Sequence, residues 1–208
     1  FLYIKEDEDL HTMVTDGSSR LKPGMELVVP RYYVYEDVPL RTDMQGDSSL
    51  IAFDYILDAG RTPIHSYCDL SIGLRHMPVA DTTKYYIVQK AGKWQSSMGG
   101  KYANGWIKTR VRSLGTFSVD VDTIAPQITP IGQGGWRTSR NIRFRIKDME
   151  SGIGSYKVYI DGKFVLFGLK KGILVIQDPE KVKKGVPHKL EVTVTDQCGN
   201  MARKEYKF

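Results

Sequence analysis

The sequence lacks long apolar runs, and it has few residues suited to nucleophilic or metal chemistry. No stretch approaches the roughly 20 apolar residues that span a bilayer, so we expect no membrane insertion. The 208 residues contain two cysteines and four histidines. Alternation places Cys68 on the buried face of a predicted strand, whereas Cys198 falls in a predicted turn in the other half of the chain. A disulfide would have to join a core to a distant turn, so we expect none. Helix signals are nearly missing too, which favours an all-β fold.

Strand signals are clearest in the second half of the sequence. Apolar and polar residues alternate over 189–195, the period of a strand that buries one face, and a tight turn follows. Asp161-Gly162 joins two alternating runs and predicts a two-residue hairpin, because both residue types tolerate positive φ. The predicted strands are 127–131, 142–147, 156–160, 163–167, 173–177, 189–195 and 201–207. Seven strands in about 85 residues are typical of an immunoglobulin-like or fibronectin type III-like sandwich.

The first half is predicted to form a separate β-domain, because the chain is too long for one sandwich of about 100 residues. Clusters of glycine, proline, aspartate and serine, such as those at 43–49 and 97–100, separate the apolar runs. No element is predicted for residues 1–24. The predicted strands are 25–35, 50–57, 67–74, 84–90, 106–112 and 116–121.

The boundary between the domains is predicted at residues 122–126. Pro126 cannot donate to a β-ladder and drives Ala125 toward an extended conformation, which suits entry into the edge strand of a new sandwich. The fold prediction is therefore all-β, with two consecutive antiparallel β-sandwiches. The N-terminal domain covers residues 1–123, and the immunoglobulin-like or fibronectin type III-like domain covers residues 124–208.

Positive charge is concentrated in the second predicted domain. Residues 124–208 contain 16 lysine and arginine residues against 8 acidic ones, a net charge of +8, whereas residues 1–123 have 14 against 16, a net charge of −2. Alternation places Arg143, Arg145 and Lys147 together on the solvent face of one strand. A predicted loop adds further cations, at Lys181, Lys183 and Lys184.

This basic surface has two interpretations. It is either a solvated face that keeps the protein soluble, or a binding surface for an anionic partner. Such a partner would be an acidic envelope polymer or another part of the parent protein. Nucleic acid is not expected, because the chain shows no helix-turn-helix, RRM or zinc-finger pattern.

The second half of the chain contains four ordered motifs, Asp-Thr-x-Ala-Pro at 122–126, Ile-x-Asp-x-x-Ser-Gly-Ile at 146–153, Tyr-x-x-x-Ile-Asp-Gly-Lys at 156–163 and Val-Thr-Asp-x-x-Gly-Asn at 194–200. These motifs resemble the immunoglobulin-like or fibronectin type III-like domains of secreted bacterial proteins. With residues 110–122 before them, they resemble more narrowly the C-terminal region of envelope proteins that carry a lysostaphin-like (LytM-type) zinc endopeptidase domain upstream. The resemblance covers roughly residues 25–208.

The resemblance implies a non-catalytic accessory region of a cell-wall metallopeptidase that acts on peptidoglycan. It implies a periplasmic, cell-envelope or extracellular location, with peptidoglycan or another acidic envelope polymer, and an upstream catalytic domain of the same chain, as partners. The sequence begins at Phe1 with an acidic stretch nearby, which we interpret as a piece of a longer protein. The alternative is a stand-alone secreted glycan-binding or adhesion module without a peptidase.

The ligands of such a peptidase are not found in this sequence. That family binds zinc through His-x-x-x-Asp and a later His-x-His, and no His-x-His is present. His65 and Asp69 fit the first motif by spelling, yet four residues along a strand span about 13 Å, too far for one metal. Gly-x-Ser-x-Gly is also absent. We therefore predict that this chain is not an enzyme, and we assign no catalytic, cofactor or metal residues.

Two weaker groups of candidate residues remain. Asp148 and Glu150 lie in one predicted turn and Asp196 and Asn200 in another, and an immunoglobulin-like topology could bring both turns to one end, as a calcium site would require. The stronger interpretation is structural, with the aspartates accepting hydrogen bonds within their own turns. The second group consists of aromatic residues in or beside glycine-rich turns, Trp94, Tyr102, Trp106 and Trp136. Exposed rings would stack on sugars, and core packing is the alternative.

Overall fold

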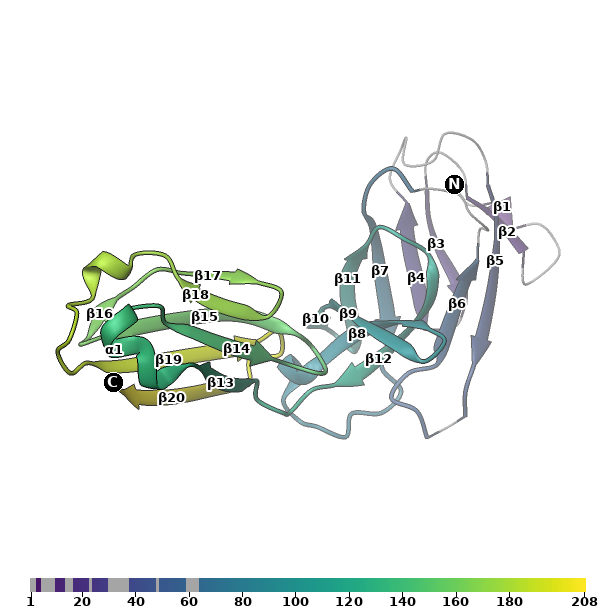
Figure 1. Ribbon diagram of the computed structural model, residues 1–208. Coiled ribbons are helices and arrows are strands. Elements are labelled where there is room, and N and C mark those ends of the chain that lie inside the picture. Colours follow the sequence, from purple (N-terminus) through teal and green to yellow (C-terminus); the bar gives the residue numbers. More distant parts are fainter. Residues whose placement is uncertain are drawn as a thin grey trace. The chain divides into compact units, whose positions relative to one another are not determined.

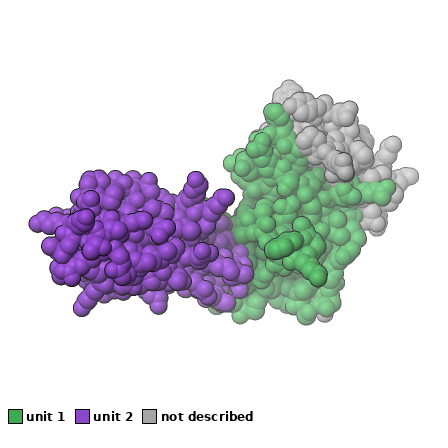
Figure 2. All heavy atoms as spheres, in the orientation of Figure 1, with its two compact units in different colours: residues 1–121 green, residues 122–208 purple. Residues whose placement is uncertain are grey.

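The computed structural model describes residues 3–4, 10–13, 17–22, 24–29, 38–47, 49–58 and 64–208. The chain divides into two compact units, Phe1–Val121 and Asp122–Phe208, each drawn in its own colour in Figure 2. Every sheet in both units is antiparallel, so the prediction of an all-β protein is confirmed (Figure 1). The division falls two residues before the predicted boundary, because the side chain of Asp122 bonds to Ser151 and Asn200 of the second unit.

The first unit is built from two sheets that enclose one core. The seven-stranded sheet has the order β1 (Tyr3–Ile4), β2 (Leu10–Met13), β5 (Val38–Gln45), β6 (Asp54–Asp58), β12 (Gly115–Val121), β8 (Tyr85–Ala91) and β9 (Trp94–Gly99). The five-stranded sheet has the order β10 (Lys101–Ala103), β11 (Trp106–Val111), β7 (Cys68–Gly73), β4 (Met25–Val29) and β3 (Gly17–Lys22). The inner faces meet in a cluster that includes Tyr55, Leu70, Ile107 and Phe117.

Within the described residues, all six strands predicted for the first unit are present, mostly with shorter bounds. Several others were missed. Residues 43–45 and 97–99 were predicted to lie in turn clusters, but they belong to β5 and β9. Among the described residues β9 is an edge strand that pairs only with β8, and its serine and glycine residues leave no apolar alternation to detect. Residues 30–37, which include part of the predicted strand 25–35, lie outside the described residues.

The second unit is a sandwich of two four-stranded sheets. One has the order β13 (Gln127–Ile131), β14 (Arg143–Lys147), β18 (Ile173–Ile176) and β17 (Phe167–Lys170). The other has the order β16 (Lys163–Phe164), β15 (Ile153–Ile160), β19 (Lys189–Asp196) and β20 (Met201–Lys207). The single α-helix of the described residues is α1 (Trp136–Ser139), and three short 3₁₀ turns are η1 (Thr82–Lys84), η2 (Gln133–Gly135) and η3 (Pro179–Lys181).

The strand predictions for the second unit are confirmed, with one refinement. The predicted strand 163–167 is not continuous: residues 163–164 are the whole of β16, and residue 167 is the first of β17. The predicted hairpin turn is present, with φ of 51° at Asp161 and 77° at Gly162. Within the described residues, no helix has the length and apolar character that a bilayer-spanning helix requires.

Candidate functional site

Three cations form a row on the outer face of β14. Arg143, Arg145 and Lys147 are exposed, while Phe144 and Ile146 between them are 0% and 2% exposed. The predicted solvent face is therefore confirmed. Because side chains two residues apart on a strand are separated by about 7 Å, the row extends over about 14 Å.

The face around this row contains no acidic residue in the register of the four strands. Arg145 pairs with Thr129 on β13 and with Ile173 on β18, and Lys170 of β17 lies beyond Ile173. The remaining neighbours in these rows are Gln127, Ile131, Val175 and Gly168. None of the three cations of β14 has an ion pair among the residues that the structure describes. We call this surface, Arg143, Arg145, Lys147 and Lys170, the basic face.

On the outer face of the other sheet, the charged side chains of β19 and β20 form ion pairs. Lys189 lies 3.0 Å from Glu191 and 3.2 Å from Glu205, and Arg203 lies 2.5 Å and 3.8 Å from the same two carboxylates. Hydrogen bonds from Lys189 and then Arg203 lower the pKa of Glu191. The four side chains thus neutralise one another on the outer face of β19 and β20, whereas the cations of the basic face remain without a counterion from the described chain.

The predicted basic loop is partly neutralised. Lys181 bonds to Asp178 at 2.6 Å, and that hydrogen bond raises the pKa of Lys181, so this lysine does not offer a free charge. Lys183 and Lys184 are exposed and have no ion pair among the described residues. The loop is anchored by the guanidinium of Arg137, whose Nε donates to the carbonyl of Gly185 at 2.9 Å.

The aromatic candidates separate into buried and exposed residues. Trp136 was included in the candidate surface, which is wrong: its side chain is 0% exposed and its Nε1 donates to the carbonyl of Ile131 at 2.9 Å. Its ring packs edge-on against Phe144 at 5.0 Å, because the short helix α1 places it in the core.

The other three aromatics lie on the two sheets of the first unit. Trp94 is 80% exposed beside Gly92 at the β8–β9 hairpin. Tyr102 is 36% exposed on β10, and Trp106 is half-buried on β11. β9 and β10 belong to different sheets, so the three rings do not line one strand face. Trp94 is the ring most available to a partner.

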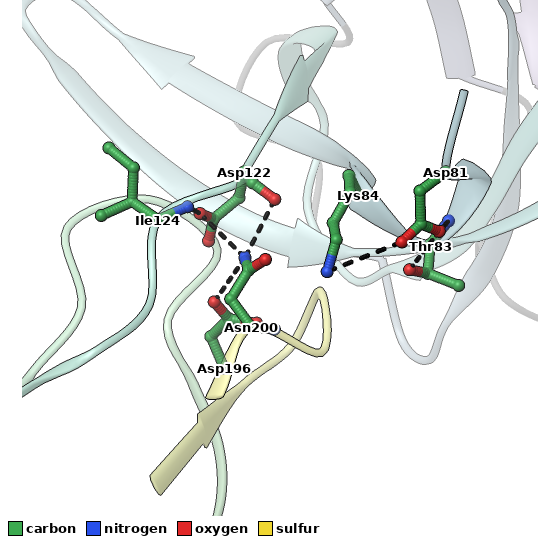
Figure 3. Close-up of polar contacts among 7 residues, drawn as sticks. All are labelled: Asp81, Thr83, Lys84, Asp122, Ile124, Asp196 and Asn200. Atoms are coloured by element: carbon green, nitrogen blue, oxygen red, sulfur yellow. Dashed lines mark hydrogen bonds and ion pairs between the residues drawn. The ribbon is translucent and has the colours of Figure 1, made fainter. Parts of the chain in front are cut away.

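The two predicted acidic turns do meet at one end of the second unit, and Asp122 joins them. Figure 3 shows Asp122 beside Asp196 and Asn200 of the second turn. Carboxylate oxygens of Asp122, Asp148 and Asp196 all lie within 4.8 Å of one another, and Asp122 and Asp196 are buried. Burial raises the pKa of Asp196; hydrogen bonds from Asn200 oppose this shift, and the neighbouring carboxylates add to it.

These carboxylates accept hydrogen bonds from the chain itself. Asp148 accepts from the N–H of Gly152 at 2.7 Å, and Asp196 accepts from the N–H of Asn200 at 2.8 Å. This confirms the interpretation of turn-stabilising aspartates. Carboxylates at this spacing have the chemistry of calcium ligands. Their observed hydrogen bonds, however, give them a structural role, which is to stabilise the two turns.

Asp122 was not recognised as a member of this group. One of its oxygens accepts from the N–H and hydroxyl of Ser151, at 3.0 and 2.5 Å. The other accepts from the N–H of Ile124 at 2.9 Å (Figure 3). The signal for it was the Asp-Thr-x-Ala-Pro motif, in which the aspartate ties the connecting segment to the second unit. In the first unit, Asp81 makes a local turn of the same type with Thr83, accepting from its N–H at 3.0 Å.

The cysteines and His65 lie in surroundings that do not activate them for chemistry. Cys68 and Cys198 are both buried and neither forms a disulfide. Burial, followed by the charge of Asp69, raises the pKa of Cys68 to about 11. His65 lies in a bend before β7, and Asp69 on β7 lies 3.8 Å from Arg110. The Cys68 thiol is therefore not activated as a nucleophile.

Residues 12–122 match the family model of the Zu5-like domain, which covers more than half of the chain. The chain belongs to the Zu5-like domain family. The Zu5-like domain begins within β2, includes both sheets of the first unit from there on, and ends at Asp122. The second unit, with its basic face, follows the matched residues. No curated protein matches the chain.

Proposed function

We propose that this chain is a non-catalytic binding region in which the second unit holds an anionic polymer on its basic face. The observation that carries the proposal is the contrast between the two outer faces. Arg143, Arg145 and Lys147 stand in a row without counterions among the described residues, while Lys189 and Arg203 on the other sheet are matched by two glutamates.

The energetics favour a partner for the unpaired row. Two neighbouring cations about 7 Å apart repel each other by about 0.6 kcal/mol in water, and an extended polyanion would replace that repulsion by attraction. The planar guanidinium groups of Arg143 and Arg145 suit two-pronged contacts with carboxylate or phosphate groups. A row of repeated charges on one strand fits a polymer that presents repeated anions.

Within this proposal, the polymer belongs to the bacterial envelope, with peptidoglycan or another acidic polymer as the partner. Support comes from the motifs at 122–126, 146–153, 156–163 and 194–200, which resemble the C-terminal region of envelope proteins with a LytM-type peptidase. Catalysis would then reside in an upstream zinc endopeptidase domain, and this region would position it on the cell wall outside the cytoplasm.

A second candidate function is a stand-alone glycan-binding or adhesion module. The observation that favours it is Trp94, whose ring is 80% exposed on the first unit and offers a stacking surface for a sugar. A Trp94→Ala variant that loses binding to neutral glycans, with its binding to acidic polymers unchanged, would support this second function.

The charge-based proposal is tested with soluble polymers and matched variants. We expect the full chain to bind polygalacturonate, an acidic polymer, and not to bind dextran, a neutral one. The variant R143S/R145S/K147S should lose this binding. The control K157S/K163S/K207S removes the same charge from exposed positions on the other sheet and should retain it. Equal loss in both variants would show that net charge, and not the basic face, determines binding.

A further inference from the structure

A groove runs along one open side of the second unit, between the edge strands of its two sheets. It has a volume of about 490 Å³ and is lined by residues 126–129, at β13, and 202–204 of β20. β13 and β20 are each the outermost strand of their sheet, and they lie next to each other on one side of the unit (Figure 1). The groove is therefore bounded by two strand edges.

The backbone of β20 has a free edge along this groove. His188 and Phe208 exchange both of their main-chain hydrogen bonds, at 2.8 and 3.1 Å, and the N–H of Asp196 donates to Asn200 at the other end. Hydrogen-bonded pairs alternate along an antiparallel ladder, so the even-numbered residues of β20 bond to β19. The N–H and C=O groups of the odd-numbered residues 201, 203 and 205 consequently point away from β19, and no strand pairs with them among the described residues.

Lys204 breaks the apolar pattern of the inner face. Its side chain is on the same face of β20 as those of Ala202 and Tyr206, which pack against the core. It pairs with Val192, which is 0% exposed. An apolar residue would be expected at such a position. Instead an exposed lysine lines the groove and has no ion pair among the described residues. Departures of this kind from the local pattern are expected at functional or strained positions.

We propose that the groove receives an extended peptide that adds to β20 as a new strand and places an acidic side chain on Lys204. The free main-chain groups of β20 supply the ladder that gives such peptides their affinity, and Lys204 supplies the side-chain preference. Gln127 and Thr129 on the other wall pair with Lys147 and Arg145 of the basic face, so the positive potential also favours an acidic segment. This site does not depend on the polymer-binding function proposed above.

A second copy of the chain fits this edge less well than an acidic peptide. In the antiparallel pairing that places Arg203 opposite Glu205 of another copy, the two Lys204 side chains face each other. Like charges directly opposite destabilise a strand pair, and lysine on an edge strand is a common protection against self-association. The side chains of β20 therefore select against a copy of β20 and favour a partner of opposite charge.

The test uses the full chain, labelled with ¹⁵N and titrated with capped peptides. The probe is the capped hexapeptide Val-Thr-Asp-Thr-Val-Thr, whose valines share the face of the aspartate. It is compared with the same peptide carrying lysine for aspartate and with one N-methylated at alternate residues. We expect amide shifts in residues 201–205, at least about fivefold weaker binding of the lysine peptide, and loss of binding on N-methylation, because the ladder needs free N–H groups.

Matched variants separate the contribution of Lys204 from that of general charge. K204Q should weaken the acidic peptide about fivefold, while K157Q, on the outer face of β15, should leave it unchanged. An affinity for the acidic peptide that is unchanged by N-methylation of the peptide or by K204Q would overturn the proposal. Absence of peptide binding at millimolar concentration, together with dimerisation of K204V in sedimentation, would overturn it too and assign Lys204 to protection against self-pairing. K204Q should still bind polygalacturonate, which distinguishes this site from the basic face.

Discussion

Nδ1 of His188 lies 2.6 Å from Oδ2 of Asp161, and this contact favours the protonated form of the histidine. Nε2 of the same ring lies 2.7 Å from the carbonyl oxygen of Lys183. A carbonyl and an ionised carboxylate can only accept, so this geometry, with an acceptor at each ring nitrogen, favours the imidazolium form of His188. Burial alone would lower the pKa of His188, but the hydrogen bonds to Asp161 and Lys183 and the charge of Asp161 outweigh it and raise the pKa above 6.5.

This contact predicts a pH-dependent stability. Because the folded-state pKa of His188 is raised, its contribution is complete below 6.5 and is lost as the pH rises through the folded-state value. For Asp161, burial would raise the pKa, yet the N–H of Lys189 and the His188 ring lower it below 3.8, so its contribution is present above 3.8 and is lost in acid. The pair therefore stabilises the second unit most between these values.

The variant H188Q tests this pH dependence. Because Asp161 is half-exposed, with a side-chain exposure of 50%, we expect only about 1 kcal/mol of destabilisation near pH 5, shrinking at higher pH. Urea unfolding of parent and variant at about pH 5, 7 and 9 measures the difference. A difference that stays constant from acid to alkali would contradict a raised pKa for His188.

The two sides of β14 should respond differently to substitution. Phe144 is 0% exposed and packs against Trp136 and Phe167, so Phe144→Ala should destabilise the second unit by about 3 kcal/mol or more. Arg145→Ser, on the outer side of the same strand, should change the free energy of unfolding by less than about 0.5 kcal/mol. Chemical denaturation of both variants gives the comparison, and similar losses would mean that the strand is not buried on one face.

Turn glycines offer a matched test of backbone strain. Gly162 and Gly199 have φ of 77° and 79°, and a Cβ at either position would meet nothing within 4 Å. Replacement by valine should therefore cost more than about 1 kcal/mol through the backbone alone. Gly134 is equally uncrowded and is not among the positive-φ glycines, so Gly134→Val should be milder. Thermal melts that rank Gly134→Val as the most damaging would refute the turn assignments.

Asp122 should matter to the second unit although it is the last residue matched to the Zu5-like domain. A buried carboxylate that accepts from Ser151 and Ile124 leaves those donors unsatisfied when it is removed, so Asp122→Ala should destabilise the second unit by about 2–4 kcal/mol. The fragment 122–208 should fold alone with β-type circular dichroism. A fragment starting at residue 124 should be less stable, and equal melting of the two fragments would show that Asp122 contributes nothing.

The sequence predicted the second unit well because its strands alternate regularly. Alternation alone placed Arg143 and Phe144 on opposite faces, and residue type alone predicted the turn at Asp161-Gly162. Trp136 was harder to place, since no periodicity accompanies a four-residue helix, and only the folded chain puts its ring beside Phe144. Glycine and serine in an edge strand concealed β9 in the same way.

Contacts between distant segments account for the rest of what the sequence did not reveal. Asp122 and Asp196 are separated by most of the second unit, and only its topology brings their carboxylates together. The pairing of Arg203 with Glu191, and hence the contrast between the two outer faces, depends on the register of β19 and β20. The inward position of Lys204 likewise needs the observed ladder.

Retention on insoluble peptidoglycan sacculi is the most direct test of the proposed function. The full chain and R143S/R145S/K147S would be compared at low and high salt, because attraction of exposed charges is screened over about 8 Å at physiological ionic strength. We predict that the parent is retained at low salt and released at high salt, and that the variant is not retained at either. Equal retention of parent and variant at low salt would contradict the account.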